Sequence, residues 1–350
     1  MYLDYAATTP MLDCVRKAMW EAEDKFFANA SALHTPGHLA MNKIEECRSL
    51  LAELINAEPE EIIFTSGASE SNNTVIRTFD DCEIFTSPLE HHSILETAKQ
   101  YSGNKKPRLY SFMLANNETG DILKLPKKQK NEYLHSDLTQ ALGKIPIDVK
   151  KLDLDYATFS AHKIGGPIGV GALYVRKDAP FKPLIIGGNQ EKKRRGGTYN
   201  TVGIVGFKEA LKYMKKNNTP SIFVTNILNL RNTLAKRILS DIPGSSLNTD
   251  LAEGKSLPNI LNASFKAAEG ESIQLYLDAE GIIVSTGSAC AAGDIKPSHV
   301  LMAKTGDAEV AHSSIRFSFG LDSTMEDVDK VMKVLPGIVK RLQGISTIGF

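Results

Sequence analysis

Residues 160–175 read SAHKIGGPIGVGALYV and place Lys163 between two strand-like runs. The apolar run 156–159 comes before this lysine, and the run 171–175 follows a glycine-rich turn. The spacing predicts that Lys163 lies at the end of a strand, where an aldehyde could reach its amine. Lysine amines form Schiff bases with carbonyl compounds, and pyridoxal 5′-phosphate (PLP) is a cofactor that uses this chemistry.

Two further residues could act together with Lys163. Asp137 stands near the end of another short run, in HSDLTQ, where a carboxylate could keep the PLP ring nitrogen protonated. Cys290 lies in STGSACAAG. Most free cysteines are small buried hydrophobes, but these small polar neighbours favour an exposed thiol that can react.

Length and composition indicate an ordinary soluble globular protein. The chain has 350 residues and a formal net charge of zero, so it can bury a large core, and no overall charge argues for nucleic acid or a membrane surface. No signal peptide and no apolar stretch of the roughly 20 residues that span a bilayer are visible. Four cysteines without a CxxC pair fit a reducing compartment, and we expect a cytoplasmic protein. Three of them fall in helix or strand patterns and are interpreted as structural: Cys14, Cys47 and Cys82.

Apolar runs alternate with helical patterns along the chain, which is typical of an α/β protein with a mostly parallel sheet. A break at residues 218–220 suggests a domain boundary. We therefore predict a large domain over 13–217 and a small domain formed by 1–12 and 218–350. The predicted helices cover 39–55 and about 222–239, and the predicted strands cover 61–64, 83–85, 109–114, 156–159 and 171–175.

The turn Gly67-Ala68-Ser69 joins a predicted strand to a predicted helix. Such a turn can bind a phosphate through main-chain N–H groups, although Ser69 could instead be an ordinary N-cap. The glycines of residues 165–171 suggest a dinucleotide loop, but a strand follows them where that fingerprint needs a helix, which excludes a nicotinamide site. The basic run 192–195, which precedes GGTYN, has the composition of a nuclear-localisation signal or a nucleic-acid patch.

The chain resembles the cysteine desulfurases of the NifS/IscS type, in the class V aminotransferase branch of PLP enzymes. This resemblance implies the type I fold of PLP-dependent transferases, in which a large domain with a mostly parallel sheet accompanies a smaller α+β domain. The matching strings cover nearly the whole chain in the family's order: YLDYAATTP at residue 2, FTSGASESNN at 64, EHHS at 90, NNETG at 116, DLTQ at 137, SAHKIGGPIGVGALYV at 160, RRGGTYN at 194, STGSACAAG at 285 and HSSIRFSFG at 312.

The resemblance implies a role for each matching residue. Lys163 would carry the cofactor, Cys290 would accept sulfur, and His91 would stack on the cofactor ring and transfer protons. Arg316 would bind the substrate carboxylate, with Asn117 beside it and close to the phenolic oxygen of PLP. Thr198 would reach the phosphate of the neighbouring subunit, and the basic run 192–195 before it would form an anion-binding loop at the active site. The other implied cofactor-binding residues are Ala68, Ser69, Asp137, Gln140, Ser160 and His162.

The implied reaction is the removal of sulfur from L-cysteine by a homodimer. L-Alanine would be released, and the persulfide on Cys290 would pass to a sulfur-acceptor protein, either an iron–sulfur scaffold or a thiolation enzyme. No metal, membrane or direct nucleic-acid binding is expected. A selenocysteine lyase or another class V lyase, and a non-catalytic sulfur-transfer scaffold, are the alternatives. Residues 94–115 are shorter than the family's stretch by roughly one strand–helix unit.

Overall fold

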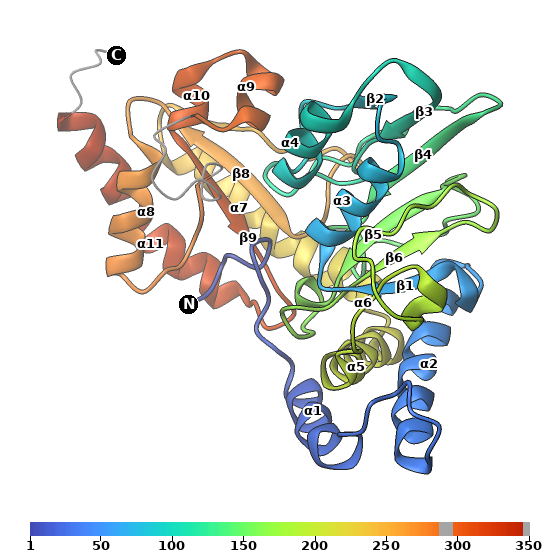
Figure 1. The fold of residues 1–350 in the computed structure, drawn as a ribbon. Coiled ribbons are helices and arrows are strands. Elements are labelled where there is room, and N and C mark those ends of the chain that lie inside the picture. The colour runs from blue at the N-terminus through green and yellow to red at the C-terminus, as the bar shows by residue number, and fades with distance from the viewer. Residues whose placement is uncertain (287–296, 346–350) are drawn as a thin grey trace. The chain divides into compact units, whose positions relative to one another are not determined.

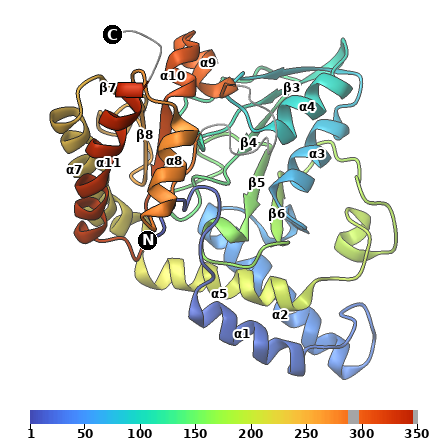
Figure 2. The ribbon, with the colours of Figure 1, turned by 90° about the vertical axis from the view of Figure 1, so that its left-hand side faces the viewer.

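The computed structural model describes residues 1–286 and 297–345, so the prediction for Cys290 lies outside the described residues. The chain forms two compact units, shown from two sides in Figures 1 and 2. The larger unit comprises residues 9–114 and 124–219, and the smaller unit comprises 1–8, 115–123 and the chain from 220 onward. The segment 115–123, which we predicted within the large domain, therefore packs in the smaller unit.

The larger unit contains a six-stranded sheet with the order β1-β6-β5-β4-β3-β2. Only β6 runs antiparallel to its neighbours, and the remaining pairs are parallel, which confirms the predicted mostly parallel sheet. Both β5 and β6 are buried along their whole length, as expected for strands covered on both faces. The strands are β1 (Ile62–Thr65), β2 (Cys82–Thr86), β3 (Lys105–Ser111), β4 (Glu132–Asp137), β5 (Tyr156–Ser160) and β6 (Gly171–Val175).

Two groups of helices pack within this unit. Helices α3 and α4 contact each other and the strands, whereas α1 and α2 pack against α5. Helix α2 begins four residues before the predicted start because the His34 side chain accepts from the main-chain N–H of Gly37 and a proline occupies the first turn. The helices are α1 (Asp13–Lys25), α2 (Thr35–Ile55), α3 (Ala68–Thr78), α4 (His92–Tyr101) and α5 (Thr201–Asn217).

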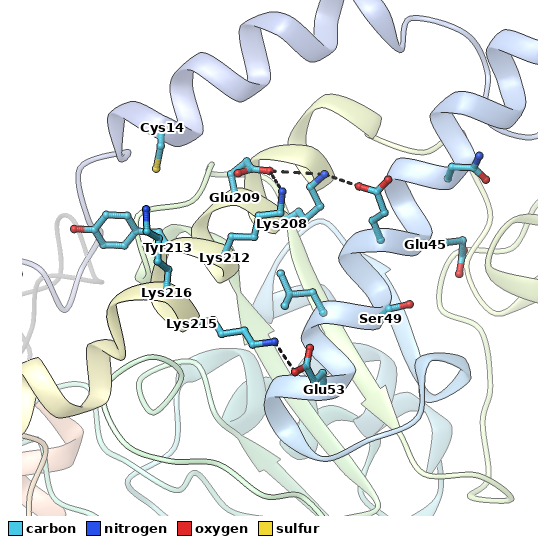
Figure 3. Close-up of a pocket in the computed structure, with 13 residues that line it drawn as sticks. Cys14, Glu45, Ser49, Glu53, Lys208, Glu209, Lys212, Tyr213, Lys215 and Lys216 are labelled. Carbon is cyan, nitrogen blue, oxygen red and sulfur yellow. Dashed lines mark hydrogen bonds and ion pairs between the residues drawn. The ribbon is translucent and has the colours of Figure 1, made fainter.

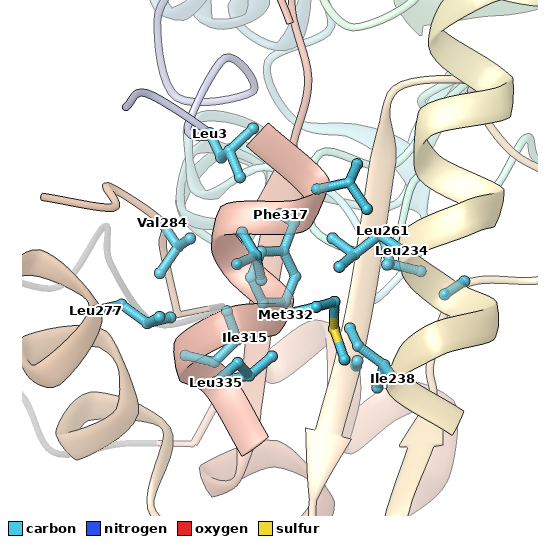
Figure 4. Packing of buried hydrophobic residues seen from close by; sticks show 14 of the residues in the cluster. Leu3, Leu234, Ile238, Leu261, Leu277, Val284, Ile315, Phe317, Met332 and Leu335 are labelled. Carbon is cyan, nitrogen blue, oxygen red and sulfur yellow. The ribbon is translucent and has the colours of Figure 1, made fainter. Parts of the chain in front are cut away.

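The smaller unit is built on a three-stranded antiparallel sheet, β7-β8-β9. Its apolar core lies between that sheet and the helices α7, α8 and α11, and Leu3 from the N-terminal segment joins this core (Figure 4). Bridges from Asp4 to Ser318 and from Tyr2 to Ile283 hold the same segment. The elements are β7 (Ser245–Leu247), β8 (Ile260–Phe265), β9 (Ser314–Ser318), α7 (Leu228–Asp241), α8 (Gly270–Ala279), α9 (His299–Thr305), α10 (Ala308–His312) and α11 (Met325–Ile345).

The predicted helix over 222–239 is divided into three pieces. Helix α6 (Thr219–Ile222) leads into a π-helical turn (Phe223–Ile227), and α7 follows. The break before α6 was predicted correctly: Asn218 adopts a left-handed conformation (φ 46°) that ends α5, and the proline at 220 is tolerated only in a first turn. In the described part of the chain, no helix is long and apolar enough to cross a membrane.

Candidate active site

The ends of β1 and β5 lie next to the start of β6, at one end of the sheet in the larger unit. Thr65 at the end of β1 and Ser160 at the end of β5 both pair with Gly171 at the start of β6. A Cβ atom on Gly171 would lie 2.6 Å from the Cα of Gly67, so glycine is required for this close approach. A Cβ on Gly67 would in turn face the Ser160 hydroxyl at 4.0 Å. The predicted phosphate-binding residues Ser160 and 67–69 therefore lie at the same end of the sheet.

Helix α3 begins without a side-chain cap. Its N-cap is Gly67, which makes no side-chain capping bond, and Ala68 and Ser69 are the first residues of the helix. The interpretation of Ser69 as an ordinary N-cap is therefore wrong. The first intrahelical bond runs from the Ser71 N–H to the Gly67 carbonyl, so the preceding N–H groups have no intrahelical acceptor and suit an anion.

Lys163 lies just beyond β5, in the short 3-10 turn Ala161–Lys163, which confirms the predicted strand end. The Thr9 hydroxyl donates to the His162 carbonyl and accepts from the Gly165 N–H, over 2.7 Å in each case. These bonds fix the turn on both sides of Lys163. Strand β6 follows the glycines, which confirms the argument against a dinucleotide loop.

Asp137 is the last residue of β4, the parallel neighbour of β5. Its side chain is buried, and it accepts hydrogen bonds from Asn72 Nδ2 and from the main-chain N–H of Thr139, each at 2.9 Å. Gln140 is buried in the turn that follows. A buried carboxylate held by two donors remains a fixed acceptor that can face a protonated ring nitrogen.

Two histidines near these residues are held neutral. Burial is the main reason that the pKa of His135 falls to about 4, and this ring lies between the hydroxyls of Ser111 and Thr158 at 2.8 and 3.0 Å. Burial, followed by the positive charges of Lys163 and Lys144, lowers the pKa of His162 to about 4. Both rings are therefore neutral at physiological pH and can form hydrogen bonds without adding charge.

His91 is the N-cap of α4, where its Nδ1 atom accepts from the Ser93 N–H at 3.1 Å. The Nδ1 side of the ring is thus bonded to the protein. His92 is exposed, as expected of a surface histidine.

Lys144 was missed by the sequence analysis, because a lone lysine in a turn is usually interpreted as a surface charge. It is only 3% exposed, and its Nζ atom donates to the Lys163 carbonyl over 2.9 Å. Burial and the nearby Lys163 charge lower the pKa of Lys144 to about 7. In the described residues Lys144 forms no ion pair. In the sequence, only its position four residues after Gln140 indicated that Lys144 could lie near the site.

Thr198 is exposed, on a loop that a buried ion pair supports. Arg48 forms two parallel bonds of 2.8 Å to Glu191, and Glu191 belongs to a run of left-handed residues that continues through residue 193. Arg195 pairs with Glu70 in the first turn of α3. A hollow of about 200 Å³ lies beside this loop and is lined by residues that include Thr198 and Arg195.

The smaller unit holds Arg316 and Asn117 in contact. Arg316 on β9 is buried; its Nη1 donates to the Asn117 carbonyl over 2.9 Å, and its Nη2 pairs with Asp4 at 2.6 Å. Its Nε is buried and has no partner in the described residues. The main chain of Ser285 pairs with that of Arg316, immediately before the segment that carries Cys290.

Glu118 is a second buried ionisable residue that the sequence analysis missed, although it lies within the NNETG string. Burial raises its pKa to about 7. It accepts a 2.5 Å hydrogen bond from the Ser298 hydroxyl, which also caps α9 by accepting from the Leu301 N–H. Glu118 therefore holds the start of α9, the first element after the segment that carries Cys290.

The residues of the larger unit fit PLP. The uncapped start of α3 suits the phosphate, and the buried Asp137 carboxylate suits the ring nitrogen. Lys163 lies in the turn just beyond β5, the strand next to that of Asp137. A separate open groove between α1, α2 and α5 contains none of the predicted site residues (Figure 3). Three of its lysines pair with glutamates: Lys208 with Glu46, Lys212 with Glu209 and Lys215 with Glu53.

Comparison with known proteins places this arrangement in a family. The sequence matches the family described as aminotransferase class-V over residues 1–109 and 103–331. The chain belongs to the class V aminotransferase family. The cysteine desulfurase IscS of Dictyoglomus turgidum is 39% identical, and the alignment covers 99% of this chain and 96% of that protein. The predicted resemblance to cysteine desulfurases is thereby confirmed.

Two solved structures agree with the observed fold. A NifS-like protein superposes with a TM-score of 0.87 at 34% identity, and the match covers 97% of this chain and 99% of the other. A protein described as SspA in complex with cysteine gives a TM-score of 0.75 at 29% identity, over 91% of this chain and 98% of the other. The predicted fold class is therefore confirmed.

Proposed function

We propose that this class V protein is a PLP-dependent cysteine desulfurase that takes sulfur from L-cysteine and releases L-alanine. One observation carries the proposal: Asp137 ends β4, and Lys163 lies just beyond the end of β5, the parallel neighbour of β4. The uncapped start of helix α3 lies beside these strand ends. The IscS relative and the cysteine complex of SspA support cysteine as the substrate.

Each residue of the larger unit has a defined task in this proposal. When bound, PLP supplies an electron sink that stabilises negative charge at the substrate α-carbon. Asp137 would hold the ring nitrogen in its protonated form, and Lys163 would carry the cofactor and then move the α-proton with its amine. The phosphate and phenolic-oxygen contacts would come from Ala68, Ser69, Ser160, His162 and Gln140.

Arg316 and Asn117 would orient the substrate carboxylate. A guanidinium binds a carboxylate through parallel N–H donors, and the buried Arg316 Nε has a hydrogen available for that purpose. Asp4, which pairs with Nη2, would keep the guanidinium aligned. Loss of the Arg316 charge should therefore weaken cysteine binding more than PLP binding.

Cys290 would perform the sulfur transfer. Its thiolate attacks the substrate sulfur, a sulfur–sulfur bond forms, and the bond between the substrate sulfur and its β-carbon breaks. The β-carbon is reduced and takes up a proton to become the methyl group of alanine, while the Cys290 sulfur is oxidised to a persulfide. No further oxidant or reductant is needed for this step.

The active form would be a homodimer. Thr198 lies exposed beside the 200 Å³ hollow, and two large apolar side chains near it are open to solvent: Ile168 is 77% and Ile186 88% exposed. A second copy of the chain would cover these side chains and bring Thr198 to its cofactor phosphate. An iron–sulfur scaffold or a thiolation enzyme in the cytoplasm would then accept the sulfur.

The direct test of the activity is to incubate purified protein with L-cysteine and a thiol reductant and to measure L-alanine and sulfide. Equal amounts of both products are expected. Selenocysteine serves as the competing substrate: alanine release from selenocysteine alone would favour a selenocysteine lyase. Protein that lacks the yellow colour of PLP and releases no alanine from either substrate would favour the non-catalytic scaffold.

A further inference from the structure

A chain of hydrogen bonds in the larger unit connects Asp137, at the end of β4, with His91, at the start of α4. Asn72 Nδ2 donates to Asp137 Oδ2 and to Ser93 Oγ, over 2.9 Å in each case. Ser93 Oγ lies 2.8 Å from His91 Nδ1, and the Ser93 main-chain N–H donates to the same Nδ1 over 3.1 Å. Asn72 and Ser93 thus bridge two residues of the proposed active site.

The donor and acceptor of each hydrogen bond in this series can be assigned from the groups at its two ends. Asp137 accepts at both oxygens, from Asn72 and from the Thr139 N–H, so the Asn72 amide must present its NH₂ group to it. The second hydrogen of that group is directed to Ser93 Oγ. The Ser93 main-chain N–H can only donate, so His91 Nδ1 must accept, and the hydrogen of the Ser93 hydroxyl is then directed to the same nitrogen.

His91 Nδ1 therefore receives two donors, one hydroxyl and one main-chain N–H. A ring nitrogen that accepts a hydrogen bond carries no proton, so the neutral ring must carry its proton on Nε2. Asn72 is fully buried, so water does not compete for the bonds that set this direction. The arrangement fixes the tautomer as well as the orientation of the ring.

The surroundings also oppose a second proton on this ring. His91 caps α4, and a positive charge there would meet the positive end of the helix dipole. Among the described residues, the titratable groups near His91 include Asp137, His92 and Glu90. Asp137 acts through Asn72, the exposed His92 has its ring centroid 6.5 Å away, and burial raises the pKa of Glu90, which disfavours a negative charge next to His91.

We propose that Asn72 and Ser93 are positioning residues that hold His91 as the neutral tautomer with its proton on Nε2. His91 then presents an N–H donor at Nε2 to the group bound beside it. The proposal rests on the proposed function only for the identity of that group. In the same network, Asn72 joins the carboxylate that would bind the ring nitrogen to the histidine that would stack on the ring.

The test is an NMR pH titration of isotope-labelled histidine in the full-length protein as purified, without added cysteine. His91→Gln identifies the signal. In Ser93→Ala the main-chain N–H remains but one donor to Nδ1 is lost, so the protonation midpoint of His91 should rise by roughly half to one pH unit. Asn72→Leu should raise it as well, because the Ser93 hydroxyl is then free to turn and accept from a protonated ring.

The double variant distinguishes a relay from two separate effects. If Asn72 acts through Ser93, Asn72→Leu combined with Ser93→Ala should shift the midpoint no further than Ser93→Ala alone. Ser93→Thr, which keeps the hydroxyl, should restore the wild-type midpoint. Thr97→Val is the matched control, because this buried α4 hydroxyl bonds to Ser93 O and Asn73 but not to His91. Unchanged midpoints in both single variants, or additive shifts, would overturn the proposal.

Neutron diffraction from crystals of the wild-type protein supplies a second measurement that needs no variant. Deuterium should be found on His91 Nε2 and not on Nδ1, and deuterium on Nδ1 would overturn the proposal. Neither measurement depends on turnover. A protein that shows the fixed tautomer but releases no alanine from cysteine would contradict the proposed function and leave the assignment of Asn72 and Ser93 intact.

Discussion

The Nζ atom of Lys144 donates a hydrogen bond over 2.9 Å to the main-chain oxygen of Lys163. The turn that begins after Asp137 thus supports the backbone of the residue that would carry PLP. Lys144 is buried, and burial together with the Lys163 charge lowers its pKa to about 7. An unfolded lysine titrates near 10.4, so folding releases a proton from Lys144 between these two values.

This relationship predicts how stability changes with pH. Between about pH 7 and pH 10 the unfolded state binds more protons at Lys144 than the folded state, so its contribution to the free energy of unfolding rises with pH. Lys144→Met removes this contribution. The free energy of unfolding of the wild type, measured in denaturant relative to Lys144→Met, should therefore increase across this range. Lys151→Met, at a side chain that is 85% exposed, is the control and should show no such trend.

PLP should be attached to Lys163. Borohydride reduction of purified protein followed by peptide mapping should find the cofactor on the peptide that contains this residue. Lys163→Ala should lose turnover by at least about a hundredfold, because the residue both carries the cofactor and moves a proton, while PLP can still bind through Asp137 and the start of α3. A reduced adduct on any other lysine would show that the site is assigned wrongly.

Dimerisation should depend on the apolar side chains near Thr198. Ile186→Asp places a charge on a surface that the proposal covers with a second copy, so the dimer dissociation constant in sedimentation experiments should rise at least about tenfold. Leu275→Asp, at a 71% exposed position on α8, is the matched control and should not change it. A wild-type monomer with full activity would contradict the proposed assembly.

Sequence patterns were sufficient where one local rule determines the structure. The alternation of apolar runs predicted the sheet, and the short runs before Asp137 and Lys163 placed both residues at strand ends, as β4 and β5 show. The strand after the glycines of 165–171 was also evident, because ALYV has no helical period. The same reasoning failed for 222–239, where one apolar pattern runs through a π-helical turn.

Contacts between distant polar side chains could not be predicted in this way. Asn72 lies on α3 and meets both Asp137 and Ser93, yet the helical period only shows that Asn72 faces inward. Lys144 and Glu118 had the appearance of surface charges, and their burial follows from tertiary packing that no periodicity records. Helix ends were also uncertain, because the His34 cap of α2 belongs to a residue type that is not a common N-cap.

Mass spectrometry after a single turnover tests directly whether Cys290 takes the sulfur of L-cysteine. One added sulfur atom is expected on the Cys290 peptide, together with one equivalent of L-alanine. Cys290→Ser should still bind cysteine and change the PLP spectrum, but it should carry no persulfide and release almost no alanine. Replacement of Cys14, Cys47 and Cys82 together should leave the reaction largely intact. Alanine release by Cys290→Ser at a rate close to that of the wild type would contradict the account.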